Sequence, residues 1–114
     1  MNEIVKLSML LEIYKNLITQ KQREVLNLYY NEDLSLAEIA ETFNISRQAV
    51  RDNIKSGEKN LLEYESKMKL LYKREKNLDL IQKLGEEINL LEKNKTSFKA
   101  VKQAYEKIKK SMEE

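Results

Sequence analysis

Three helix-start signals stand within residues 19–46, and they constrain the fold more than any other feature of the chain. Each is a hydroxyl side chain of the kind that caps a helix: Thr19, Ser35 and Ser46. Gln22 and Glu38 follow the first two caps at the three-residue spacing of a capping box. Asn44, just before the third cap, tolerates the left-handed backbone that ends a helix. The segment therefore predicts two short helices and a third that begins at Arg47.

Apolar residues recur at steps of three and four on both sides of this segment, which is the periodicity of amphipathic helices. They predict helices over residues 3–17, 20–31, 36–43, 47 to 72 or 76, 78–91 and 98–112. Gly57 lies on the apolar stripe of the fourth of these helices and is a site where it could bend. Residues 73–77 are either a charged break or a continuation of that helix. Residues 93–97 are expected to form a turn, with Thr96 or Ser97 as the cap of the last helix.

The composition supports an all-α fold. The 114 residues include no proline and only two glycines, whereas an all-β chain of this length would need many turns built from those residues. We expect a sigma region 4-like helix-turn-helix bundle, a long helix and further C-terminal helices. Residues 1–60 are predicted to form the helix-turn-helix domain, and residues 61–114 a helical extension that serves in dimerisation or packing.

Cysteine and histidine are both absent, which removes several kinds of site. The chain can form no disulfide, no thiolate or imidazole zinc site, no Cys nucleophile and no His base. It contains no Gly-rich phosphate loop, and its paired carboxylates at residues 32–33 and 86–87 lack the spacing of a calcium site. We therefore expect no enzymatic activity, no cofactor and no bound metal.

Charged side chains interrupt the apolar run at the N-terminus, so this segment does not read as a signal peptide: Glu3, Lys6, Glu12 and Lys15. No stretch approaches the ~20 apolar residues that a membrane-spanning helix needs. We expect a soluble cytoplasmic protein that does not insert into a membrane.

The helix-turn-helix is expected between Ser35 and Lys55, and its solvent face is the candidate binding surface. Ala40 is the small residue where the two helices cross, and Asn44 forms the turn. Apolar side chains hold the pair of helices rigid: Ile39, Phe43, Ile45, Val50 and Ile54. If these face the core, the other face presents the candidate nucleic-acid-binding residues: Ser46, Arg47, Gln48, Arg51 and Lys55. Arg can pair with guanine and Gln with adenine in the major groove, and Lys suits a phosphate.

The charge balance argues against strong DNA binding by this surface. Residues 1–57 carry seven basic and eight acidic side chains, whereas residues 58–114 carry fourteen basic and eleven acidic ones. A DNA-binding domain usually has a basic footprint, and Asp52 lies on the candidate surface, where it would repel phosphate. An ordinary solvated helix face is the alternative interpretation of the same residues.

Residues 19–61 resemble the fourth conserved region of bacterial sigma factors, a helix-turn-helix that reads the −35 promoter element. The matching segments are residues 22–26, 36–40 and 47–54. A sigma factor also needs a separate region that binds the −10 element, and this chain has no room for one.

About the first 70 residues are more similar to small YlxM-type proteins of Gram-positive and related bacteria. The shared features are the run SRQAV at residues 46–50, DNIK at residues 52–55, and the tyrosine pair Tyr29–Tyr30. The genes of these proteins typically lie beside the gene of the signal recognition particle GTPase. The resemblance implies an accessory role in the signal recognition particle pathway, with the particle's RNA or DNA and that GTPase as candidate partners. It implies no established enzyme activity.

Three functions remain open at this point. The first is a nucleic-acid-binding accessory protein of the signal recognition particle. The second is a transcription regulator that binds DNA as a homodimer, with the C-terminal stripes supplying the dimer contact. The third is a protein-interaction module in which the helix-turn-helix is only a scaffold, because a fold does not fix a function.

Overall fold

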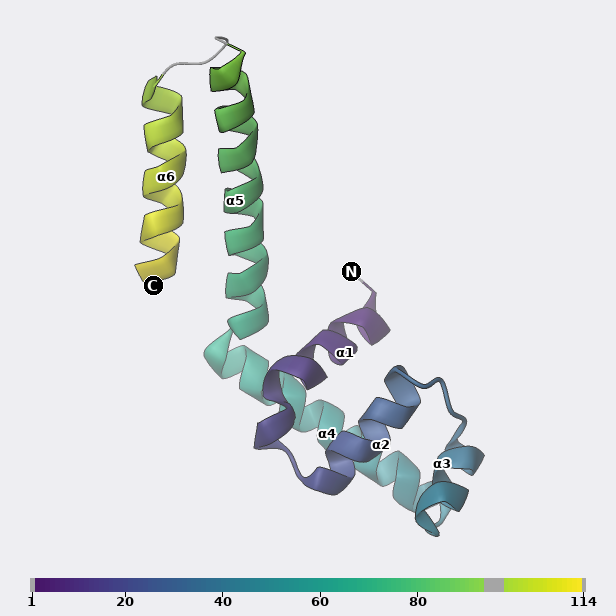
Figure 1. The fold of residues 1–114 in the computed structure, drawn as a ribbon. Coiled ribbons are helices and arrows are strands. Elements are labelled where there is room, and N and C mark those ends of the chain that lie inside the picture. Colours follow the sequence, from purple (N-terminus) through teal and green to yellow (C-terminus); the bar gives the residue numbers. More distant parts are fainter. Residues whose placement is uncertain (1, 94–97, 114) are drawn as a thin grey trace. The chain divides into compact units, whose positions relative to one another are not determined.

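The computed structural model describes residues 2–93 and 98–113 (Figure 1). These residues form helices and no strand, so the prediction of an all-α fold is confirmed for the described part of the chain. In chain order the elements are α1 (Glu3–Tyr14), the 3₁₀ helix η1 (Lys15–Leu17), α2 (Gln20–Tyr30), α3 (Leu36–Phe43), α4 (Arg47–Met68), α5 (Leu70–Glu92) and α6 (Phe98–Glu113). The chain divides into two compact units, Met1–Leu71 and Tyr72–Glu114. None of the described helices is long and apolar enough to span a membrane.

Both predicted capping boxes are present in the first unit. The Thr19 side chain accepts a hydrogen bond from the Gln22 N–H at 3.1 Å, and the Gln22 side chain accepts one from the Thr19 N–H at 3.2 Å. Ser35 and Glu38 make the same pair of bonds, each 3.1 Å long. The hydrogen bond from the Ser35 backbone also holds the pKa of Glu38 below its ordinary value. The starts of α2 and α3 are therefore fixed by local chemistry that the sequence states directly.

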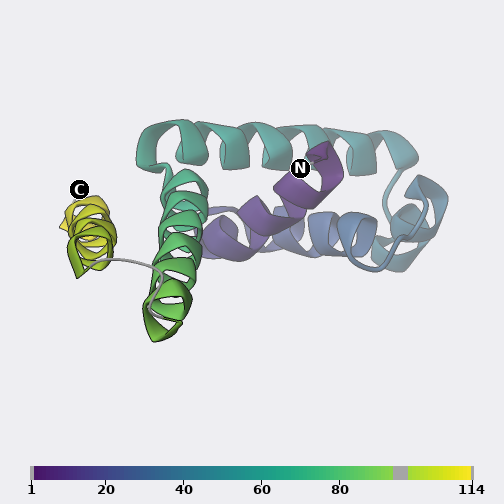
Figure 2. The same cartoon turned by 90° about the horizontal axis from the view of Figure 1, so that it is seen from above.

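Helix α4 is the element against which α1, α2 and α3 all pack (Figure 2). Its buried residues are Val50, Ile54, Gly57 and Leu61. Val50, Ile54 and Leu61 join a single apolar cluster with side chains from the other three helices, among them Leu10, Tyr14, Val25, Leu26 and Ile39. Burial of this stripe orients α4 because an amphipathic helix gains most of its stability from packing its apolar face.

Gly57 sets how closely α2 approaches α4. A Cβ atom at this position would lie 2.7 Å from Leu26 Cδ1 and 3.3 Å from Leu26 Cγ. Leu26 is fully buried, so its side chain has little room to move away. Helix α4 runs through Gly57 without a break, and the glycine marks a close contact between two helices.

The fourth helix ends earlier than residue 72 or 76, so that prediction was wrong. Helix α4 stops at Met68, and Lys69 takes the left-handed conformation with a φ of 54°. Residues 73–77 instead lie inside α5. Tyr14 and Glu65 stabilise the break. The Leu70 N–H donates to the Tyr14 hydroxyl at 3.2 Å, and the Leu71 N–H donates to Glu65 Oε1 at 3.1 Å.

Tyr14 and Glu65 are themselves joined, and a second tyrosine–glutamate pair ties α2 to α4. The Tyr14 hydroxyl donates to Glu65 Oε1 at 2.7 Å, and the Tyr30 hydroxyl donates to Glu58 Oε1. Burial raises the pKa of both tyrosines, and the hydrogen bond to the neighbouring glutamate raises it further. Each hydroxyl therefore keeps its proton to a higher pH than an exposed tyrosine, and donates it to the glutamate carboxylate.

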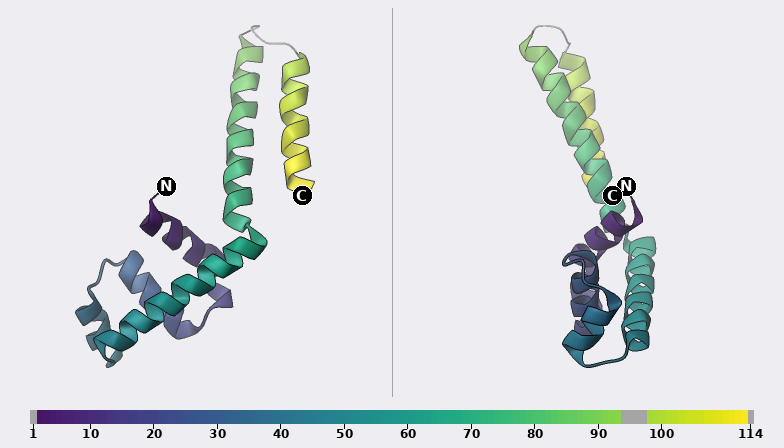
Figure 3. Two further views of the ribbon diagram at one scale, coloured as in Figure 1. Left: turned by 180° about the vertical axis from the view of Figure 1, so that it is seen from behind. Right: turned by 90° about the vertical axis from the view of Figure 1, so that its right-hand side faces the viewer.

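The second unit is a hairpin in which α6 runs antiparallel beside the main part of α5 (Figure 1 and Figure 3). The Ser111 hydroxyl donates to Asn77 Oδ1 at 2.7 Å and links the two helices near the C-terminus. The first unit extends past the boundary expected between residues 60 and 61, because Leu61 and Leu71 both belong to its core. The predicted cap at Thr96 or Ser97 lies outside the described residues.

We expect Gly57→Ala to destabilise the first unit by about 1 kcal/mol or more, because overpacking Leu26 outweighs the gain in helix propensity. Gly85→Ala is the matched control, since a Cβ atom there meets nothing within 4 Å. It should stabilise α5 by about 0.5–1 kcal/mol. Urea denaturation followed by circular dichroism measures both changes. Equal stabilisation by the two substitutions would contradict the close contact at Gly57.

We expect Tyr14→Phe to lower the free energy of unfolding of the first unit by about 1–3 kcal/mol, since Glu65 loses a donor and the Leu70 N–H loses its acceptor. Amide hydrogen exchange at Leu70 should become faster in this variant. Tyr29→Phe removes the hydroxyl of an exposed tyrosine in the same unit and serves as the control that leaves both measurements unchanged. Unaltered exchange at Leu70 in Tyr14→Phe would show that the tyrosine does not hold this break.

Candidate nucleic-acid interface

The turn between α3 and α4 is held by two hydrogen bonds at the end of α3. Asn44 adopts the left-handed conformation, with φ 53° and ψ 49°. The Ile45 N–H donates to the Ala40 carbonyl at 3.0 Å, and the Asn44 N–H donates to the Glu41 carbonyl at 3.2 Å. This pair of bonds is the Schellman motif, so Asn44 takes the place that glycine usually occupies.

Helix α4 begins immediately after this turn, and its start is capped as predicted. Ser46 Oγ accepts a hydrogen bond from the Ala49 N–H at 3.0 Å. Ile39 and Val50 are fully buried, and Phe43 and Ile45 pack partly buried against the same core. The two helices are thereby fixed to each other, and the opposite face of α4 is left to the solvent.

The structure places all five candidate residues on the exposed surface at the N-terminal part of α4: Ser46, Arg47, Gln48, Arg51 and Lys55. Arg47, Arg51 and Lys55 follow one another at four-residue steps and form a ridge along the helix. Within residues 2–93 and 98–113, none of these three side chains makes a hydrogen bond or an ion pair. We call these three residues the basic ridge.

The two polar candidates are less available than the basic ridge. The Ser46 hydroxyl already serves as the cap of α4. Gln48 Nε2 donates to Asp52 Oδ1 at 2.9 Å, one turn further along the helix. A base edge that engaged the Gln48 amide would first have to replace this hydrogen bond. The exposed side chains that are ready to meet an anionic ligand are therefore the three cations.

Two further cations near this surface were not predicted from the sequence. Lys59 is exposed one four-residue step beyond Lys55, and both lysines line a shallow hollow along α4. The four-residue spacing from Lys55 could have identified Lys59 from the sequence alone. Lys21 of α2 lies with its Nζ atom 5.9 Å from the centre of the Phe43 ring. Only the packing of α2 against α3 brings that charge to the helix-turn-helix.

Carboxylates limit the positive potential of this surface. Glu38 and Glu41 are exposed on α3, and Asp52 lies beside the basic ridge on α4. In the part of the chain that the structure describes, no three acidic, histidine or cysteine side chains are grouped to hold a metal ion. The arrangement suits contact with a phosphate backbone at moderate affinity.

These features define a helix-turn-helix protein with an exposed basic ridge on its second helix. The chain belongs to the UPF0122 family, described as "Putative helix-turn-helix protein, YlxM / p13 like", which matches residues 1–104.

Relatives in several bacteria are similar over most of their length. A UPF0122 protein of Clostridium botulinum is 47% identical over 103 residues, covering 87% of this chain and 94% of the relative. One from Halalkalibacterium halodurans is 46% identical over 89 residues, covering 78% and 82%. One from Bacillus thuringiensis is 44% identical over 108 residues, covering 95% and 98%.

We expect Ser46→Ala to lower the free energy of unfolding of the first unit by about 1 kcal/mol, because α4 loses its N-cap. Ser46→Asp should keep the stability of the unmodified protein, since an aspartate carboxylate caps a helix equally well. Ser66→Ala, at an exposed position later in α4, is the control and should change stability by less than ~0.5 kcal/mol. Urea denaturation distinguishes the three, and a stable Ser46→Ala variant would rule out the capping role.

Proposed function

We propose that this protein is a non-enzymatic, nucleic-acid-binding accessory protein of the signal recognition particle pathway, acting in the cytoplasm. The particle's RNA is the proposed ligand, and the particle's GTPase is the proposed protein partner. The observation that carries the proposal is the basic ridge. Its three exposed cations make no hydrogen bond or ion pair with any other residue that the structure describes.

The balance of charge favours RNA over a DNA operator. Asp52 lies beside the basic ridge and accepts a hydrogen bond from Gln48, the side chain best suited to read adenine. Residues 1–57 also carry one more acidic than basic side chain, unlike a dedicated DNA-binding domain. Structured RNA is recognised largely through its shape and backbone, which a short strip of cations can contact without reading base edges in a major groove.

The link to the signal recognition particle rests on sequence similarity. The run SRQAV and the segment DNIK, which carry the resemblance to YlxM-type proteins, are the same residues that form the first turns of α4. The segments that support the pathway assignment thus coincide with the candidate interface. The sigma-like resemblance of residues 19–61 supports a dimeric DNA-binding regulator as the alternative.

Fluorescence anisotropy with the particle's RNA at physiological salt tests the proposal. We expect the double variant Arg47→Ala/Arg51→Ala to bind at least about tenfold more weakly, and its salt dependence to fall by about one unit of slope for each phosphate that the variant no longer neutralises. Lys67→Ala/Arg74→Ala removes the same number of positive charges from exposed positions outside the ridge. This control should bind nearly as well as the unmodified protein.

The competing functions give different results in the same titration. Equal, weak binding to an unrelated structured RNA would reject specific recognition of the particle's RNA. Preference for a duplex with two half-sites one helical turn apart, abolished by Arg51→Ala, would favour the dimeric regulator. No binding to any nucleic acid, together with an unchanged cellular phenotype of Arg47→Ala/Arg51→Ala, would favour the protein-interaction module.

A further inference from the structure

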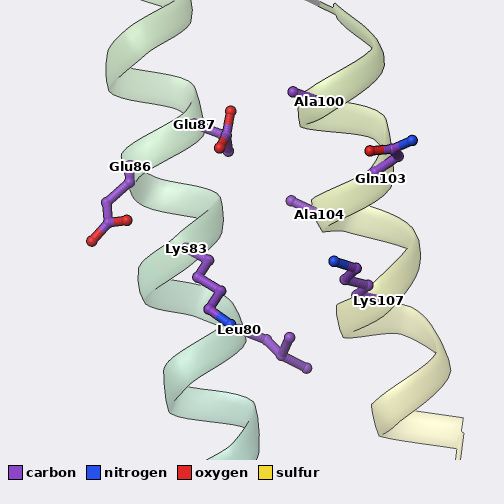
Figure 4. Close-up of a pocket in the computed structure, with 8 residues that line it drawn as sticks. All are labelled: Leu80, Lys83, Glu86, Glu87, Ala100, Gln103, Ala104 and Lys107. Carbon is purple, nitrogen blue, oxygen red and sulfur yellow. The ribbon is translucent and has the colours of Figure 1, made fainter. Parts of the chain in front are cut away.

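The seam between α5 and α6 in the second unit is built largely from small and polar side chains. Figure 4 shows Leu80 and Glu87 of α5 directed toward α6, with Ala100, Ala104 and Lys107 of α6 directed toward α5. Ile108 is the only buried residue among the described residues of this unit. A pair of helices gains stability chiefly by burying apolar stripes, and this seam buries very little of them.

Three of the five apolar residues that form one stripe along α6 face the solvent. Phe98, Val101, Tyr105, Ile108 and Met112 follow one another at alternating steps of three and four, the repeat of a coiled coil. Val101 and Ile108 are shielded, whereas Phe98 is 74%, Tyr105 54% and Met112 61% exposed. The repeat therefore forms two columns along α6. The column of Val101 and Ile108 packs within the hairpin, and the column of Phe98, Tyr105 and Met112 does not.

Helix α5 carries a matching unused column. Ile81 and Ile88 are exposed, seven residues apart, and Leu78 lies beside them. In a helix each residue advances by about 100°, so both isoleucines stand to one side of Leu80, which is directed toward α6. On α6, Tyr105 comes one residue after Ala104, which faces the seam, so it is rotated about its helix axis in the same sense as the two isoleucines. When two helices run antiparallel, residues rotated in the same sense away from the seam lie on the same side of the hairpin. We call this side the apolar face.

The charges of the two helices indicate what covers the apolar face. Residues 70–92 of α5 carry four basic and five acidic side chains, whereas residues 98–113 of α6 carry five lysines and two glutamates. The slightly acidic α5 and the basic α6 are therefore complementary in charge. A second copy of this hairpin can place its α5 against α6 of the first chain and its α6 against α5 of the first chain. An anionic membrane or nucleic acid would meet the five carboxylates of α5.

We propose that the apolar face is a homodimer interface, in which α6 of each chain packs against α5 of the other to form a four-helix bundle. Such a contact is isologous, because the same surface of both chains meets about a two-fold axis. The exposed columns then become the a and d positions of the bundle core. The interface does not depend on the basic ridge of the first unit and forms without nucleic acid.

Sedimentation velocity of the full chain, without nucleic acid, tests this interface over a range of micromolar concentrations. The expected species has twice the 13.5 kDa mass of one chain. Tyr105→Lys and Ile81→Lys should each raise the dissociation constant at least about tenfold, because every substitution places two lysines in the bundle core. Leu17→Lys is the matched control, since Leu17 is 50% exposed in the first unit and Ile81 is 48% exposed. This control should dimerise like the unmodified protein.

Circular dichroism of the two variants separates loss of the dimer from loss of the fold. Both altered positions are exposed in the hairpin, so the helix content of each variant should match that of the dissociated protein. They lie on different helices, so one well-folded variant is sufficient. A monomer at every concentration, or dimers of unaltered affinity in both variants, would overturn the proposal. Binding of a monomer to phosphatidylglycerol vesicles would also overturn it and assign the apolar face to a membrane surface.

Discussion

The close approach of α2 to α4 is the contact on which the first unit depends. Gly57 allows the fully buried Leu26 to lie directly against the backbone of α4, at a distance that leaves no room for a methyl group. In this position, α4 packs its buried apolar stripe against α1, α2 and α3 at once. The orientation of α4 also selects the side chains that meet the solvent, so the same packing that stabilises the core defines the candidate interface.

The interface that results is narrow and of mixed charge. Arg47, Arg51 and Lys55 form its basic ridge, while Asp52 lies among them and engages Gln48. A surface of this kind contributes backbone contacts more readily than base-specific ones, because a charged ridge attracts phosphate whatever the sequence. Under the proposed function, the affinity of this surface for nucleic acid should fall as the salt concentration rises.

The second unit presents a different physical problem from the first. The first unit has a core of fully buried side chains from four helices, whereas the hairpin of α5 and α6 buries one residue among those described. Many of its large apolar side chains are instead exposed to solvent. A partner that covered the apolar face would lower the free energy of the hairpin, as the packing of α4 does for the first three helices.

Local chemistry determined much of this protein from the sequence alone. The capping boxes at Thr19 and Ser35, the left-handed Asn44 and the cap at Ser46 each act over a few residues, so their sequence signals give the starts of α2 to α4. Periodicity likewise identified the exposed face of α4. Tertiary structure alone decided the break after Met68, because Tyr14 and Glu65 stand 51 residues apart in the chain. It also decided that Gly57 serves a close contact, that Lys21 reaches Phe43, and that Gln48 is held by Asp52, since each depends on where a second side chain lies in space.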